Sequence, residues 1–73
     1  MKFKIAVFKS RKEAIEFGEM MGRQGVWARA ISTPSRLSSA CGLSVEFKAR
    51  DLGVAKRVLS FGDFFSFKGF YDL

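Results

Sequence analysis

The sequence predicts an α+β ferredoxin-like fold, a split βαβ sandwich in which a four-stranded antiparallel sheet carries two helices on one face. Four segments alternate apolar and polar residues with the two-residue period of strands, and two segments repeat apolar residues at helical spacing. These segments follow one another as strand, helix, strand, strand, helix, strand. Right-handed crossovers and antiparallel pairing give the strand order 4-1-3-2. With 73 residues, the chain is expected to form one domain, residues 1–73.

The first half of the chain predicts a strand, a helix and a second strand. Residues 2–8 form the first strand, with Phe3, Ile5 and Val7 on one face and Lys2, Lys4 and Ala6 on the other. Ser10 and Glu13 match the capping box that begins a helix, and Gly25 is a natural helix stop. The apolar helix face comprises Ala14, Ile15, Phe17, Gly18, Met21 and Gly22. Residues 26–33 form the second strand, with Val26, Ala28 and Ala30 opposite Trp27, Arg29 and Ile31.

The second half predicts a strand, a helix and a final strand. Residues 43–49 form the third strand, in which Leu43, Val45 and Phe47 alternate with Ser44, Glu46 and Lys48. Asp51 is the expected N-cap of the second helix, and Gly62 ends it. The inward residues of this helix are Leu52, Val54, Ala55, Val58 and Leu59. The last strand takes residues 63–73, with Phe65 and Phe67 on one face.

The composition excludes several classes of site within one chain. One cysteine cannot form an intrachain disulfide framework. Without histidine, neither a structural zinc site nor serine–histidine or cysteine–histidine catalysis is available, so no metal and no other cofactor is expected. The formal net charge of +6 favours anionic partners. No apolar run approaches the ~20 residues of a membrane helix, and no secretion signal is recognisable, so a cytoplasmic location without membrane association is expected.

The stretch "TPSRLSSACG", residues 33–42, holds the only cysteine and the only proline of the chain. It joins the second and third predicted strands. Because the third strand runs antiparallel to the first, its start lies beside the end of the first strand. Cys41 is therefore expected near "KSRK", residues 9–12, where the first helix begins. Nearby cations and a helix N-terminus both favour a thiolate, the reactive form of cysteine.

Other residues of these two stretches are candidates for supporting the thiolate or its substrate. Gly42 permits close approach of the backbone, and Arg36 is a bidentate donor to anions. A threonine followed by Pro34 is typical of a short helical turn. The supporting set comprises Thr33, Arg36, Ser38, Ser39, Gly42, Ser10, Arg11 and Lys12. The alternative stays open that the cysteine is an inert, half-buried residue and the serines are ordinary turn residues.

The longer stretch "TPSRLSSACGLSVEF" resembles the signature of the DUF3343 family, described as selenium/sulfur carrier-like proteins. The matching residues are Thr33, Pro34, Arg36, Ser38, Cys41 and Gly42. Ala40 departs from the pattern, since some members have serine there. "SRKEA" and "FKGFYDL" extend the similarity over nearly the whole chain.

The resemblance implies that Cys41 carries sulfur or selenium as a persulfide or perselenide, without enzymatic turnover of its own. It also implies two protein partners, a sulfur or selenium donor such as a desulfurase and an acceptor. A carrier gains from a single cysteine, because a second, resolving thiol would expel the cargo.

A small basic binding module is the alternative function. The predicted topology is also that of an RNA-binding domain, but the outward residues of the third strand, Ser44, Glu46 and Lys48, include no stacking aromatic, so RNA is the less favoured partner. The uncovered sheet face is expected to present Phe8, Trp27 and Ile31, an apolar set typical of self-association as a homodimer. Lys4, Arg29 and Glu46 on the same face would instead keep a monomer hydrated.

Overall fold

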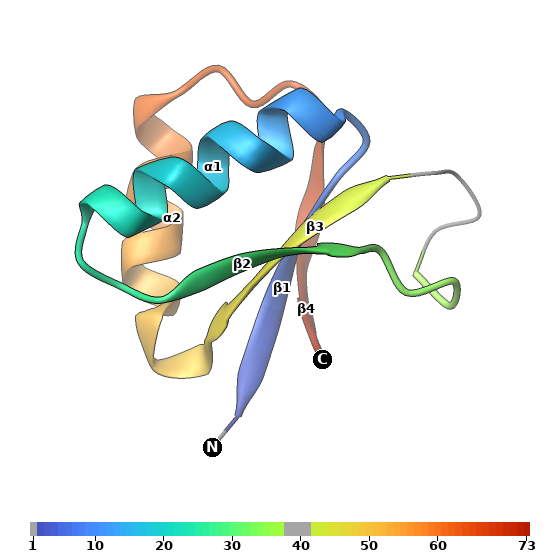
Figure 1. The fold of residues 1–73 in the computed structure, drawn as a ribbon, viewed down its shortest axis with the longest axis horizontal. Coiled ribbons are helices and arrows are strands. Elements are labelled where there is room, and N and C mark those ends of the chain that lie inside the picture. The colour runs from blue at the N-terminus through green and yellow to red at the C-terminus, as the bar shows by residue number, and fades with distance from the viewer. Residues whose placement is uncertain (1, 38–41) are drawn as a thin grey trace.

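The computed structural model describes residues 2–37 and 42–73, which form a four-stranded antiparallel sheet and two α-helices (Figure 1). In chain order the elements are β1 (Phe3–Phe8), α1 (Arg11–Arg23), β2 (Ala28–Ser32), β3 (Leu43–Lys48), the short 3-10 helix η1 (Ala49–Asp51), α2 (Leu52–Phe61) and β4 (Phe67–Asp72). The strand order β2-β3-β1-β4 is the predicted order read from the other edge. The α+β ferredoxin-like fold is therefore confirmed.

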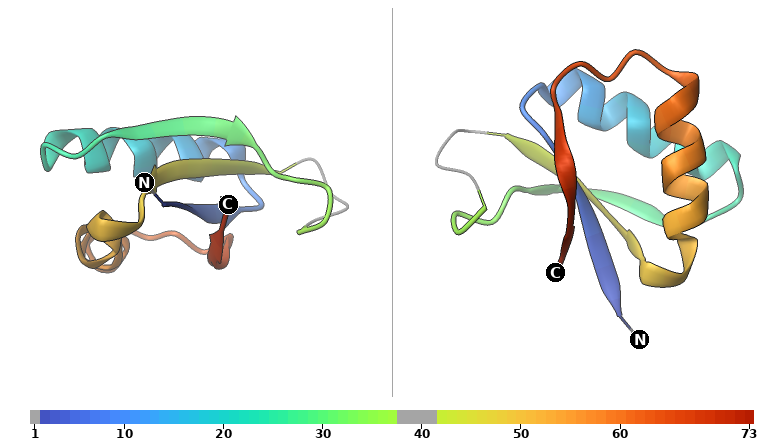
Figure 2. Two further views of the ribbon diagram at one scale, coloured as in Figure 1. Left: turned by 90° about the horizontal axis from the view of Figure 1, so that it is seen from below. Right: turned by 180° about the vertical axis from the view of Figure 1, so that it is seen from behind.

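The hydrophobic core lies between one face of the sheet and the two helices. Its buried members are Ala6, Phe8, Ala14, Phe17, Met21, Leu43, Val45, Phe47, Ala55 and Val58. The first helix and the second both contribute to this single cluster, so both cover the same sheet face, as predicted. Figure 2 (right) shows α1 and α2 to one side of the crossed strands.

The sheet register corrects the predicted faces of β1. Phe8 pairs with Leu43, and directly opposed residues share a face, so Phe8 belongs to the core and not to the uncovered face. Lys4 pairs with Phe47 and also lies on the helix side. The two-residue alternation of β1 is as predicted, but Phe8 lies on the same face of the strand as Ala6, and that face packs against the helices. On β2, Ile31 pairs with Ser44 on the uncovered face, as predicted.

The uncovered face is largely shielded by its own side chains. Ile5 and Val7 lie on it yet are 0% and 2% exposed. Tyr71 pairs with Ile5, and its ring lies over Gly69, which in turn pairs with Val7. Gly69 has a φ of +141°, a conformation that favours glycine, and a Cβ there would meet the tyrosine ring at 3.3 Å. The aromatic ring thus covers both the glycine and the central strand beside it.

A second group covers the β2–β3 side of this face. The Glu46 carboxylate accepts hydrogen bonds from Arg29 Nε at 3.2 Å and Nη2 at 2.8 Å, and its side chain is 7% exposed. The Arg29 guanidinium lies 5.8 Å from the centre of the Trp27 ring, and that ring contacts Phe3 edge-on at 5.7 Å. An ion pair, a cation–π contact and an aromatic pair therefore cover the β2–β3 side of this face.

Both helix starts lie where the sequence places them. Ser10 is the N-cap of α1, and its Oγ accepts a hydrogen bond from the Glu13 N–H at 3.3 Å. Asp51 occupies the N-cap position of α2 without a side-chain capping bond. Ile15, predicted to face inward, is 48% exposed. The buried stripe of α1 is narrower than predicted: Ala14, Phe17 and Met21 are buried, and Met20 is partly buried against the core.

The last strand begins later than predicted, at Phe67. Phe65 does not share a core face with Phe67; it lies in a turn before the strand and is 88% exposed. The Phe67 N–H donates to the Phe64 carbonyl at 3.3 Å and closes this turn. Phe64 packs towards the core in its place, at 5.7 Å from the Phe8 ring centre and 5.6 Å from that of Phe17.

Candidate functional site

Gly42, the residue bonded to Cys41, lies against the end of β1. A Cβ atom on Gly42 would stand 2.7 Å from the Phe8 carbonyl oxygen and 3.3 Å from the Thr33 hydroxyl. No side chain fits there without movement of the backbone. This steric constraint explains why a glycine follows the cysteine. The predicted site residues Ser38, Ser39 and Cys41 themselves lie outside the described residues.

Thr33 forms the other wall of this junction. Its hydroxyl lies 2.7 Å from the Oγ of Ser44, a residue that is fully buried on β3, and its N–H donates to the Gly42 carbonyl at 3.5 Å. The following residues turn as the Thr-Pro pair predicts, because the Leu37 N–H donates to the Pro34 carbonyl at 2.9 Å. Two members of the predicted site, Thr33 and Gly42, are thus brought together.

The N-terminus of α1 carries a hydrogen-bonded relay that the sequence did not reveal. In a simple capping box the Glu13 carboxylate would accept from the Ser10 N–H. Here the Ser10 N–H donates to Ser66 Oγ at 3.0 Å, and Ser66 Oγ donates to Glu13 Oε1 at 2.9 Å. The Ser66 N–H donates to the same carboxylate oxygen at 2.9 Å, and the Lys9 N–H donates to the Ser66 carbonyl at 3.0 Å. Ser66 therefore fastens the segment before β4 to the start of α1.

The end of β1 is consequently flanked from both sides. Gly42 touches Phe8 from the β3 side, and Ser66 bonds Lys9 and Ser10 from the β4 side. Figure 1 shows the start of α1, the start of β3 and the start of β4 at the same end of the sheet. This juxtaposition of segments distant in sequence is the one that the predicted topology requires.

Basic side chains surround this end of the sheet. Lys9, Arg11 and Lys12 are all exposed. Glu13, with its carboxylate at the α1 N-terminus, is the opposing charge among these residues. Arg36 is placed differently: its Nη2 donates to the Asp72 carbonyl oxygen at 3.1 Å, at the far end of β4. The described contact of Arg36 thus directs it to β4 and not to the start of α1.

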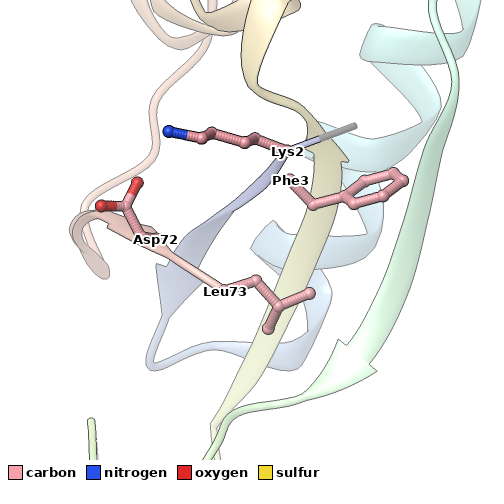
Figure 3. A pocket seen from close by; sticks show the side chains of 4 residues that line it. All are labelled: Lys2, Phe3, Asp72 and Leu73. Carbon is pink, nitrogen blue, oxygen red and sulfur yellow. The ribbon is translucent and has the colours of Figure 1, made fainter.

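A surface pocket lies at the opposite end of β1. It has a volume of about 440 Å³ and is lined by Lys2, Phe3, Asp72 and Leu73 (Figure 3). At this end of the sheet the Lys4 ammonium bonds the Asp72 carboxylate at 2.6 Å, and this bond holds the pKa of the carboxyl below its usual range. The pocket lies a full strand length from Gly42, so it is not part of the site around Cys41.

Two absences can be stated of the part of the chain that the structure describes. Within residues 2–37 and 42–73, no three acidic or cysteine side chains gather as metal ligands would. In that same part of the chain, neither helix has the length and apolar character required to cross a bilayer.

Sequence reasoning missed two residues of this region, Ser66 and Phe65. Both were assigned to a continuous strand, because the run of phenylalanines imitates strand alternation. Ser66 was the signal that could have revealed the turn, because serine is a common turn residue and it interrupts the run of phenylalanines.

Comparison with known proteins places the chain in a family. No curated protein and no solved structure matches it. Residues 4–71 match the sequence model of the family described as "Putative Se/S carrier protein-like". This match covers both helices, β2, β3 and all but one residue each of β1 and β4, and it agrees with the resemblance carried by the Thr33–Gly42 stretch. The chain belongs to this Se/S carrier protein-like family.

Proposed function

We propose that the protein carries sulfur or selenium on Cys41, as a persulfide or perselenide, between a donor protein and an acceptor protein. The family match over residues 4–71 is the observation that carries this proposal. The packing of Gly42 against Phe8 supports it, because the glycine anchors the cysteine-bearing segment at the end of β1.

The loading step conserves atoms and electrons. The Cys41 thiolate attacks the outer sulfur of a donor persulfide, R–S–S–H. The donor S–S bond breaks, a new S–S bond forms on Cys41, and the donor leaves as the thiolate R–S⁻. Unloading is the same exchange in reverse, with an acceptor thiolate attacking the outer sulfur and Cys41 leaving. Attack requires a thiolate, so a serine hydroxyl cannot replace it.

The surrounding residues have supporting roles in this proposal. The exposed cations Arg11 and Lys12 favour the negative charge of the thiolate. Ser10 caps α1 and so fixes the position at which the helix begins after β1. Thr33 and Gly42 hold the base of the loop. Ser38 and Ser39 would supply donors to the loaded group, and Arg36 would do so on release from the Asp72 carbonyl that it bonds at 3.1 Å. The carrier needs no second cysteine, which would release the cargo by forming a disulfide.

Mass spectrometry of the intact protein tests the proposal. The wild type is incubated with sodium polysulfide, desalted and measured before and after treatment with dithiothreitol. We expect a gain of one sulfur atom that the reductant removes, no gain for Cys41→Ser, and slower loading for Arg36→Ala. Failure of the wild type to hold a reducible adduct would reject the carrier function and favour a binding module.

A further inference from the structure

We propose that Phe65, together with the basic cluster Lys9, Arg11 and Lys12, is the docking surface for the protein that exchanges cargo with Cys41. The partner's matching surface is acidic and contains an apolar pocket that receives the phenylalanine ring. This inference rests on the proposed carrier function and adds to it the place and the chemistry of the protein contact.

Phe65 is exposed by the architecture of its turn. It occupies a central position of the turn closed by the Phe67 N–H and the Phe64 carbonyl, and 88% of it is accessible to solvent. Gly, Pro, Asn, Asp and Ser dominate such positions, because each suits the turn geometry or bonds its backbone. A large apolar ring gains nothing from this position within the monomer. Interface cores, in contrast, are enriched in aromatic residues.

The residues on both sides of Phe65 are fixed. Phe64 packs against the rings of both Phe8 and Phe17. Ser66 is bonded through its N–H, its Oγ and its carbonyl to the start of α1. The backbone that presents the ring is therefore held before any partner arrives, which lowers the entropy lost on binding.

The turn lies at the same end of the sheet as Gly42, the residue that follows Cys41 in the chain. Ser66 contacts Lys9 and Ser10 on the β4 side of β1, while Gly42 contacts Phe8 on its β3 side. Adjacent strands are ~4.8 Å apart, so the two flanks are separated by about 10 Å. A partner seated on Phe65 would therefore reach the segment that carries Cys41.

Charge selects the kind of partner. Lys9, Arg11 and Lys12 are exposed around the same end of β1, and the chain as a whole has a formal charge of +6. A second copy of the chain would bring like charges together at this surface. An acidic protein surface would be attracted and steered to it, with the rim charges acting mainly on the rate of association.

Photo-crosslinking in cells that express the chain tests the docking surface. A benzophenone-bearing phenylalanine is placed at position 65 and, as the matched control, at position 61, since Phe61 is also exposed, at 63%, but ends α2. We expect position 65 to capture an acidic protein that position 61 does not capture, and charge reversal of Lys9, Arg11 and Lys12 to abolish the capture.

The captured protein is then purified and tested for sulfur exchange with Cys41. We expect Phe65→Ser to slow this exchange by about tenfold or more, as removal of an aromatic anchor does, and Phe61→Ser to leave it unchanged. Loading by sodium polysulfide should be the same in all three proteins, because no docking is involved. No capture specific to position 65, or equal exchange by Phe65→Ser and wild type, overturns the docking proposal. Failure of polysulfide loading would instead count against the carrier function.

Discussion

Replacing Gly42 with alanine would place a Cβ atom 2.7 Å from the Phe8 carbonyl oxygen and 3.3 Å from the Thr33 hydroxyl. Even favourable carbon–oxygen contacts have separations of ~3.3–3.6 Å. The predicted cost of the substitution is therefore a steric one. The obstructing atom belongs to the backbone of the central strand β1, which pairs with neighbours on both sides and cannot move alone.

We expect Gly42→Ala to lower the free energy of unfolding by about 1–3 kcal/mol, the range typical of overpacking in a closed space. In a domain of this size a loss of about 2 kcal/mol lowers the melting temperature by roughly 8–16 °C. Gly53→Ala is the matched control, because its added Cβ would meet no atom within 4 Å apart from its chain neighbours and its own helix backbone, and the residue is in α2. That variant should gain about 0.5–1 kcal/mol from helix propensity and a less flexible unfolded chain.

Urea denaturation of the two variants, followed by circular dichroism, measures the difference. Both substitutions restrict the unfolded chain in the same way, so most of the difference between them reports the contact at Phe8. A Gly42→Ala protein as stable as Gly53→Ala would refute the steric account of the Cys-Gly pair.

Three further changes test other contacts. Arg29→Ala should cost about 1.5–3 kcal/mol, because it leaves the buried Glu46 carboxylate without the partner that donates two hydrogen bonds to it. Ser66→Ala should cost about 1–2 kcal/mol, because it breaks the relay at the start of α1. Lys4→Ala should raise the pKa of Asp72 towards its ordinary value of 3.8, as measured by NMR titration.

Each of these changes has its own check. In the Arg29→Ala protein, Glu46→Gln should restore part of the stability, since a neutral amide is less costly to bury. Ser60→Ala, at an exposed helical serine, should change stability by less than ~0.5 kcal/mol. Because the pKa of Asp72 is lowered on folding, its stabilisation is present above the unfolded-state pKa and is lost as the pH falls through the folded-state pKa. Solvent exposure keeps this contribution small, so a large acid-induced loss removed by Lys4→Ala would contradict the assignment.

The sequence was sufficient for the topology because periodicity and helix caps act locally. Ser10 and Gly25 mark the ends of α1 through backbone geometry that depends on few neighbours. The strand order followed from chain connectivity. These two together predicted that the start of β3 would lie beside the end of β1, and Gly42 does contact Phe8.

The sequence was insufficient where two apolar patterns compete. On β1 both alternating sets are apolar towards the strand end, so Phe8 was assigned to the wrong face. In the run before β4, Phe64 or Phe65 could equally face inward from pattern alone. Contacts with α1 decide between them, because Ser66 bonds Glu13 and thereby fixes which phenylalanine points to the core. Such long-range hydrogen bonds leave no periodic signal.

Removing the negative charge at the start of α1 tests whether the Cys41 thiol lies close enough to this helix to feel its charges. Glu13 is the negative charge among three cations there, and its carboxylate oxygen accepts two hydrogen bonds from Ser66. Glu13→Gln keeps an oxygen that can accept both bonds but removes the charge. If the thiolate lies about two strand spacings, ~10 Å, from this carboxylate, an effective dielectric constant between ~20 and ~80 makes the charge oppose it by about 0.4–1.7 kcal/mol. We therefore expect Glu13→Gln to alkylate at Cys41 about two- to eighteenfold faster than wild type at neutral pH and low salt. Glu19→Gln, about 9 Å further along the helix, should have a smaller effect. Equal rates in all three proteins at low salt would place the thiol beyond the influence of α1 and would remove the electrostatic support for a reactive Cys41.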